Sequence, residues 1–105
     1  MRDHVFPVEE TLVQHAISDQ RWTVPPIMEE LKEKAKAQDL WNLFMPKDTA
    51  ELIHGSVRQY LGRNGGTLSN LDYAHVCEVM GQCVFAPEVF NCNAPDTGNM
   101  EVLAR

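Results

Sequence analysis

The sequence PPIMEELKEKAKAQD, residues 25–39, determines the fold class. Ile27, Leu31 and Ala35 recur every four residues, the spacing that places side chains on one face of a helix. The two prolines at its start suit the first helical turn, where a missing N–H is harmless. Charged residues fill most other positions and indicate a solvated face. The stretch therefore predicts an amphipathic helix that buries one apolar face.

The same periodicity extends to both sides of this helix. Residues 1–19 follow helical spacing with an interruption near Pro7, which suits a first-turn position. Residues 69–80 predict a further helix, in which Ser69 is placed to cap the N-terminus. Gly81 is placed for a left-handed cap at its C-terminus.

The segment 40–46, LWNLFMP, is a dense apolar turn that we expect to be buried. Residues 47–66 are less regular. Their apolar residues fit one helical stripe, made of Ala50, Ile53, Val57 and Leu61. Asp48 or Thr49 would cap this helix and Gly62 would end it.

Residues 86–104 predict a last helix with an interruption. Pro87 favours its first turn, whereas Pro95 removes a backbone hydrogen bond and should kink the rod. The polar stretch 91–99 has low helix propensity. It is either a loop between two helices or a helix wall whose small residues let a ligand approach the backbone closely.

No segment shows strict two-residue alternation bounded by hairpin turns, and no repeat is visible. The expected architecture is therefore all-α, a small bundle of four to five helices, with residues 1–105 forming one domain.

Composition narrows the function. The chain has 105 residues, 44% of them hydrophobic, and a formal net charge of −6, which counts against nucleic acid as a partner. No apolar run approaches the ~20 residues of a membrane-spanning helix, and we expect no secretory signal, because residues 1–7 contain no apolar core of one. The cysteines Cys77, Cys83 and Cys92 match no zinc spacing and read as buried thiols in a reducing compartment, so no metal is expected.

Catalytic motifs are not found. The glycines fit neither phosphate-loop nor dinucleotide spacing, and the four histidines are scattered. From the residues alone, we expect a small acidic helical domain with no catalytic residue of its own.

Several motifs together resemble a known family. PEVFNC at 87–92, followed by APDTGNMEVL at 94–103, is similar to a stretch of acyl-CoA dehydrogenases, in the branch of family members ten and eleven. RWTVPP at 21–26, LWNLFMP at 40–46 and LSNLDYA at 68–74 match that branch in the same order. The chain therefore resembles the N-terminal helical domain of this fold, except that residues 47–66 look longer than in that branch.

The resemblance implies a flavoenzyme that removes hydrogen from the α,β bond of a long or branched fatty acyl-CoA. It implies FAD as cofactor, bound mainly by a middle β-domain, and a glutamate base in a C-terminal helical domain. Neither region lies within these residues, so this segment alone is expected to be inactive.

The resemblance also implies a site. The family's kinked helix runs along the fatty tail of the substrate, so Phe90, Asn93, Ala94 and Thr97 are the expected substrate-binding residues. Ordinary core packing is an equally good interpretation of Phe90. The expected partners are acyl-CoA, the remainder of the enzyme, electron-transfer flavoprotein or oxygen as acceptor, and further copies in a homo-oligomer.

Two further expectations concern the location of the protein in the cell and an alternative function. The family implies an intracellular enzyme, mitochondrial or peroxisomal in a eukaryote and cytoplasmic in a bacterium. The alternative function is a non-catalytic helical interaction module derived from the same domain, which would use its apolar faces to bind a partner.

Overall fold

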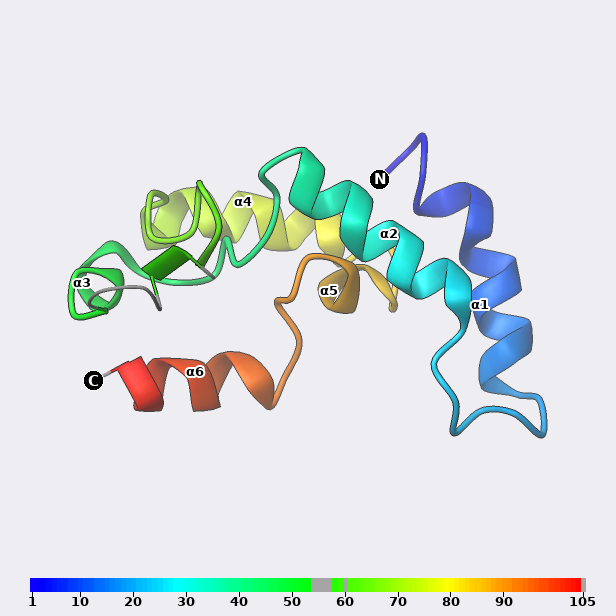
Figure 1. Cartoon of the computed structure of the whole chain (residues 1–105). Coiled ribbons are helices and arrows are strands. Elements are labelled where there is room, and N and C mark those ends of the chain that lie inside the picture. The colour runs from blue at the N-terminus through cyan, green and yellow to red at the C-terminus, as the bar shows by residue number, and fades with distance from the viewer. Residues whose placement is uncertain (54–57, 60, 105) are drawn as a thin grey trace.

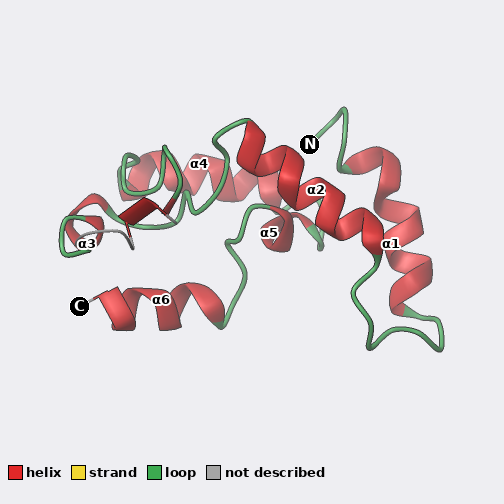
Figure 2. Ribbon diagram, viewed as in Figure 1, coloured by secondary structure: helices red, strands yellow, loops and turns green. Residues whose placement is uncertain are grey.

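The computed structural model describes residues 1–53, 58–59 and 61–104. Within these ranges all regular structure is helical and no strand forms, which confirms the all-α prediction (Figure 2). Four or five helices were expected, and the described residues form six α-helices because two of them are single turns. The elements are η1 (Phe6–Val8), α1 (Glu9–Ala16), α2 (Pro26–Ala37), α3 (Lys47–Ala50), α4 (Asn70–Met80), α5 (Ala86–Val89) and α6 (Asp96–Ala104).

The N-terminal half folds as its periodicity predicts. Pro7 lies in the short 3₁₀ turn η1, directly before α1, so the interruption expected there is confirmed. In α2 the buried residues are Met28, Leu31 and Ala35, which confirms the apolar face. Ile27 packs beside them, partly buried.

Helix α4 begins as predicted and ends differently. The Oγ of Ser69 accepts a hydrogen bond from the backbone N–H of Asp72 at 3.1 Å, which confirms the N-cap. The left-handed C-cap is wrong, because Gly81 has φ −64°. Its N–H donates to the Cys77 carbonyl at 2.8 Å, so the chain keeps a right-handed turn as it leaves the helix.

The segment after Pro46 is only briefly helical in the described residues. Helix α3 starts directly after Pro46, with no side-chain hydrogen bond at the cap, so the predicted capping by Asp48 or Thr49 is wrong. Val57 of the predicted stripe lies outside the described residues. Gly62, which was expected to end the helix, has a left-handed backbone with φ +85°.

The predicted kinked helix over residues 86–104 is wrong. Helix α5 ends at Val89, and helical structure resumes only at Asp96. Asn91 has a left-handed backbone with φ 54°, and the N–H of Cys92 turns back to the Pro87 carbonyl at 2.7 Å. A left-handed asparagine is a common helix stop. The other interpretation, a connection between two helices, is therefore right.

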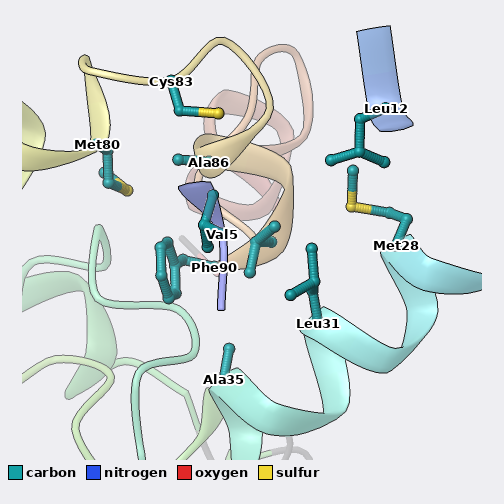
Figure 3. Packing of buried hydrophobic residues seen from close by; sticks show 10 residues of the cluster. Val5, Leu12, Met28, Leu31, Ala35, Met80, Cys83, Ala86 and Phe90 are labelled. Carbon is teal, nitrogen blue, oxygen red and sulfur yellow. The ribbon is translucent and has the colours of Figure 1, made fainter. Parts of the chain in front are cut away.

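Two apolar clusters hold these elements together. The first lies between α2 and α5 and includes the buried residues Val5, Leu12, Met28, Leu31, Ala35, Met80, Cys83, Ala86, Val89 and Phe90 (Figure 3). An ion pair across the same contact joins Lys32 to Glu88 at 3.3 Å. The second cluster consists of Phe44, Met45, Ala50 and Leu61. Its residues confirm the expected burial of segment 40–46.

The two clusters give the molecule an elongated shape. Its principal extents are 41 × 26 × 22 Å, and its radius of gyration is 14.4 Å. A compact domain of this length has about 12.9 Å. Helix α1 lies at one end, and α3 and α6 lie at the other (Figure 1). The structure therefore places α6 far from the N-terminal helices.

Candidate functional site

A groove of about 490 Å³ opens at the α3 end of the molecule. Segment 40–46, α3, α4 and α6 form its walls. Its volume is within the range of pockets that hold small organic ligands. The lining residues are Phe44, Pro46, Asp48, Thr49, Asn70, Tyr73, Thr97 and Glu101.

Local sequence explains how these walls meet. Segment 40–46 turns sharply at Asn42, whose φ is 60°, and this turn directs Phe44 into the second cluster. Pro46 then starts α3, which contacts α6. The cap at Ser69 starts α4 so that Tyr73 lies one helical turn further on. The groove thus forms where four separate segments converge.

The walls combine aromatic rings, hydroxyl groups and carboxylates. Phe44 and Tyr73 supply the rings, and two threonines supply hydroxyls. The charged residues that line the groove, Asp48 and Glu101, are both acidic. Carboxylates repel phosphates, so the groove disfavours a phosphate group or the phosphate-bearing part of a ligand.

Tyr73 is held in its neutral form. Partial burial raises the pKa of its hydroxyl above the ordinary value of 10.0, and its contacts with the thiols of Cys92 and Cys77 raise this pKa further. Burial likewise raises the pKa of the Cys92 thiol. Near neutral pH both side chains are therefore uncharged, and the Tyr73 hydroxyl lies against the thiols of Cys92 and Cys77.

The four residues expected to bind substrate do not lie together. Phe90 is in the first core cluster, with 8% of its surface exposed (Figure 3). Asn93 and Ala94 are exposed in the connection between α5 and α6. Thr97 is in the first turn of α6 and lines the groove. The reason for this separation is that the expected continuous helix is broken after Val89.

The rings of Phe44 and Tyr73, which form the aromatic wall of the groove, were not predicted as part of a site. Tyr73 shares an α4 face with the partly buried Val76, and the helical spacing of the two residues indicates burial but not a ligand site. Phe44 was expected only to be buried. Thr97 lies near Tyr73 and Phe44 because the chain turns at Asn91, and the predicted helix over residues 86–104 had no such turn.

Metal sites and membrane-spanning helices are not found in the same ranges. Across residues 1–53, 58–59 and 61–104, no three His, Cys, Asp or Glu side chains gather as a metal site. Among the helices built from these residues, none has the length and apolar character needed to cross a membrane.

Comparison with known proteins relates the chain to one enzyme family. No protein-family model matches it. Acyl-CoA dehydrogenase family member 10 of Mus musculus is 50% identical over 101 residues, which are 96% of this chain and 9% of that protein. Probable acyl-CoA dehydrogenase IBR3 of Arabidopsis thaliana is 48% identical and covers the whole chain, which spans 14% of its length. Probable acyl-CoA dehydrogenase FadE2 of Mycobacterium tuberculosis is 41% identical over 98% of the chain, which spans 22% of its length.

Proposed function

Because this chain is homologous along nearly its whole length to one segment of acyl-CoA dehydrogenases, we propose that it is part of an FAD-dependent enzyme of that kind. The enzyme would dehydrogenate the α,β bond of a long or branched fatty acyl-CoA. Identity of 41–50% with these relatives is the observation that carries the proposal. The chain spans only about a tenth to a fifth of their length, so its own contribution is a local one.

That contribution is one wall of the acyl-binding tunnel. The groove between α3, α4 and α6 suits a fatty tail because its walls include the rings of Phe44 and Tyr73. Asp48 and Glu101 make it unsuitable for the phosphates of coenzyme A. We therefore place the tail, rather than the nucleotide end of the substrate, beside Thr97.

Phe90, Asn93 and Ala94 have different parts in this proposal. Asn93 and Ala94 are exposed and available to a tail that continues beyond the groove. Phe90 packs in the first cluster and does not line the groove, so its part in this proposal is to hold the end of α5 in place.

The described residues of this chain do not fit FAD themselves. A dinucleotide is usually held by a glycine-rich turn at a helix N-terminus, which places N–H donors on the pyrophosphate. The first turn of α6 instead carries Asp96, and the adjoining groove carries Asp48 and Glu101. In this proposal the flavin and the catalytic base therefore belong to the remainder of the enzyme.

Apolar side chains on the surface are consistent with a larger assembly. Val84, Val102 and Leu103 each have 74–87% of their surface exposed. Exposed apolar groups of this kind mark surfaces that a neighbouring domain or protein covers. In the leading proposal the remainder of the enzyme covers them, and the full enzyme forms a homo-oligomer that passes electrons to electron-transfer flavoprotein or to oxygen.

The same exposed residues favour one alternative, a helical interaction module without catalysis. The two proposals differ in what the intact polypeptide can do. Purified after expression from its complete coding sequence, it should show flavin absorbance and reduce an artificial electron acceptor when acyl-CoA is added. A colourless polypeptide with no acceptor reduction for any acyl chain from 4 to 24 carbons would reject the enzyme proposal and leave the interaction module.

A further inference from the structure

Two asparagines 49 positions apart meet between segment 40–46 and the end of α5. The amide Nδ2 of Asn91 donates to Oδ1 of Asn42 at 2.6 Å. Both residues have left-handed backbones, with φ 60° at Asn42 and 54° at Asn91. Such backbones are uncommon for residues other than glycine and persist where the surroundings hold them. Asn42 is also only 1% exposed, so this pair is built into the interior.

The pair connects three parts of the molecule. The backbone N–H of Asn42 donates to the Phe90 carbonyl at 3.2 Å, which ties segment 40–46 to the end of α5 a second time. The Asn91 amide also lies 3.9 Å from Sδ of Met100, which belongs to α6. Met100 in turn packs against the second cluster. Asn91 thus contacts both a groove-forming segment and the helix that faces it.

Helix α6 lies on the surface of the molecule. None of its residues is buried, although it contacts α3. Its direction therefore depends strongly on how the connection at residues 90–95 leaves α5. Figure 1 shows this connection running from the end of α5 across to α6. Asn42 is two residues before Phe44, and Asn91 is six residues before Thr97. The hydrogen bond between the two asparagines therefore links the segment that carries Phe44 to the connection that leads to Thr97.

We propose that the Asn42–Asn91 pair is a positioning element that sets the width of the groove between α6 and the aromatic wall, and through it the acyl chain length that the enzyme accepts. This inference rests on the proposed function, because it takes the groove as the acyl site. Neither asparagine touches the tail. They act through Phe44 and Thr97, which do.

The test changes the hydrogen bond and keeps the backbone. Asn91→Gly retains the left-handed conformation, which glycine adopts freely, and removes the amide. In the intact polypeptide, the ratio of kcat/KM between a 16-carbon and an 8-carbon acyl-CoA should change about 2- to 12-fold, the effect of one net hydrogen bond. Asn42→Gly should produce a similar change, and the double variant should add little to either single variant.

The matched control removes another asparagine hydrogen bond. Asn64 donates from Nδ2 to the Asp39 carbonyl at 2.9 Å and does not line the groove, so Asn64→Gly should leave the chain-length ratio within about twofold. Equal ratios in wild type, Asn91→Gly and Asn42→Gly would overturn the positioning role. A change that is the same for both substrates would also overturn it, because that result describes a general loss of stability.

A second measurement keeps this inference separate from the proposed function. Hydrogen–deuterium exchange of the intact polypeptide should show faster exchange of the α6 amides in Asn91→Gly than in wild type, with unchanged exchange in α2. If wild type has no dehydrogenase activity, the proposed function fails and this exchange pattern still decides whether the pair positions α6. Unchanged exchange in α6 would reject the pair as a positioning element.

Discussion

Replacing Phe90 with alanine tests whether this residue is core or tunnel wall. Phe90 is 92% removed from solvent and packs in the first cluster between α2 and α5. Truncating a buried phenylalanine costs about 3–5 kcal/mol, the sum of lost burial and the cavity left behind. Phe90 also borders a small open pocket of about 40 Å³. Solvent can partly fill the new space through that opening, so we expect the lower end, about 3 kcal/mol.

That loss is large for a domain of this size. Folded domains have about 0.05–0.15 kcal/mol of stability per residue. A cost of ~3 kcal/mol corresponds to a fall in Tm of about 12–24 °C. Thermal unfolding of the purified chain, followed by circular dichroism at 222 nm, measures this directly.

The matched control is Phe6→Ala, because Phe6 is the same residue type with 36% of its surface exposed. It should lower Tm by much less than Phe90→Ala. A fall of less than about 4 °C in Phe90→Ala would mean that Phe90 contributes below ~1 kcal/mol. The assignment of Phe90 to the core, and the two-cluster description of the fold, would then be wrong.

Three further predictions follow from individual residues. Ser69→Ala removes the N-cap of α4 and should lower the unfolding free energy by about 1 kcal/mol in a urea titration, whereas Ser69→Asp, which retains an acceptor, should not. Burial raises the pKa of Cys92 above its ordinary value of 9.0 and that of Tyr73 above 10.0, so their contribution to the free energy of unfolding is complete below these values and falls as pH rises above 9 for Cys92 and above 10 for Tyr73. Cys92→Ala should reduce that alkaline loss in urea titrations at pH 8 and pH 10, and an identical pH dependence in the variant would contradict the burial argument. Ala94→Phe, which adds bulk where the acyl tail is proposed to continue, should shorten the preferred chain in a kcat/KM series, and an unchanged long-chain rate would remove Ala94 from the site.

Local pattern was sufficient to predict the regular helices. The four-residue spacing of α2 and the Ser69 cap of α4 are properties of neighbouring residues, and both appear in the structure as expected. The prediction of one kinked helix over residues 86–104 was wrong because helix propensity does not reveal a left-handed turn. Asn91 adopts that turn while it hydrogen-bonds a residue 49 positions earlier, and no local pattern contains such a contact.

The same non-local turn explains the partial prediction of the site. Thr97 was selected as a substrate residue from a supposed continuous helix, and it lines the groove for a different reason, the path of the connection after α5. Phe90 and Thr97 were expected on one wall. In the structure one lies in the first core and the other lies in the groove, because α5 and α6 are separate helices.

In the proposed function, the groove beside Thr97 receives the acyl tail of a substrate. The most direct measurement is the kcat/KM series over acyl-CoA chain lengths for the intact polypeptide carrying Thr97→Phe, with Thr97→Ser as the control of similar size. Thr97→Phe should lower kcat/KM for 16-carbon acyl-CoA at least about tenfold more than for 4-carbon acyl-CoA, while Thr97→Ser keeps the wild-type profile. An identical chain-length profile in Thr97→Phe and wild type would show that the groove does not receive the tail.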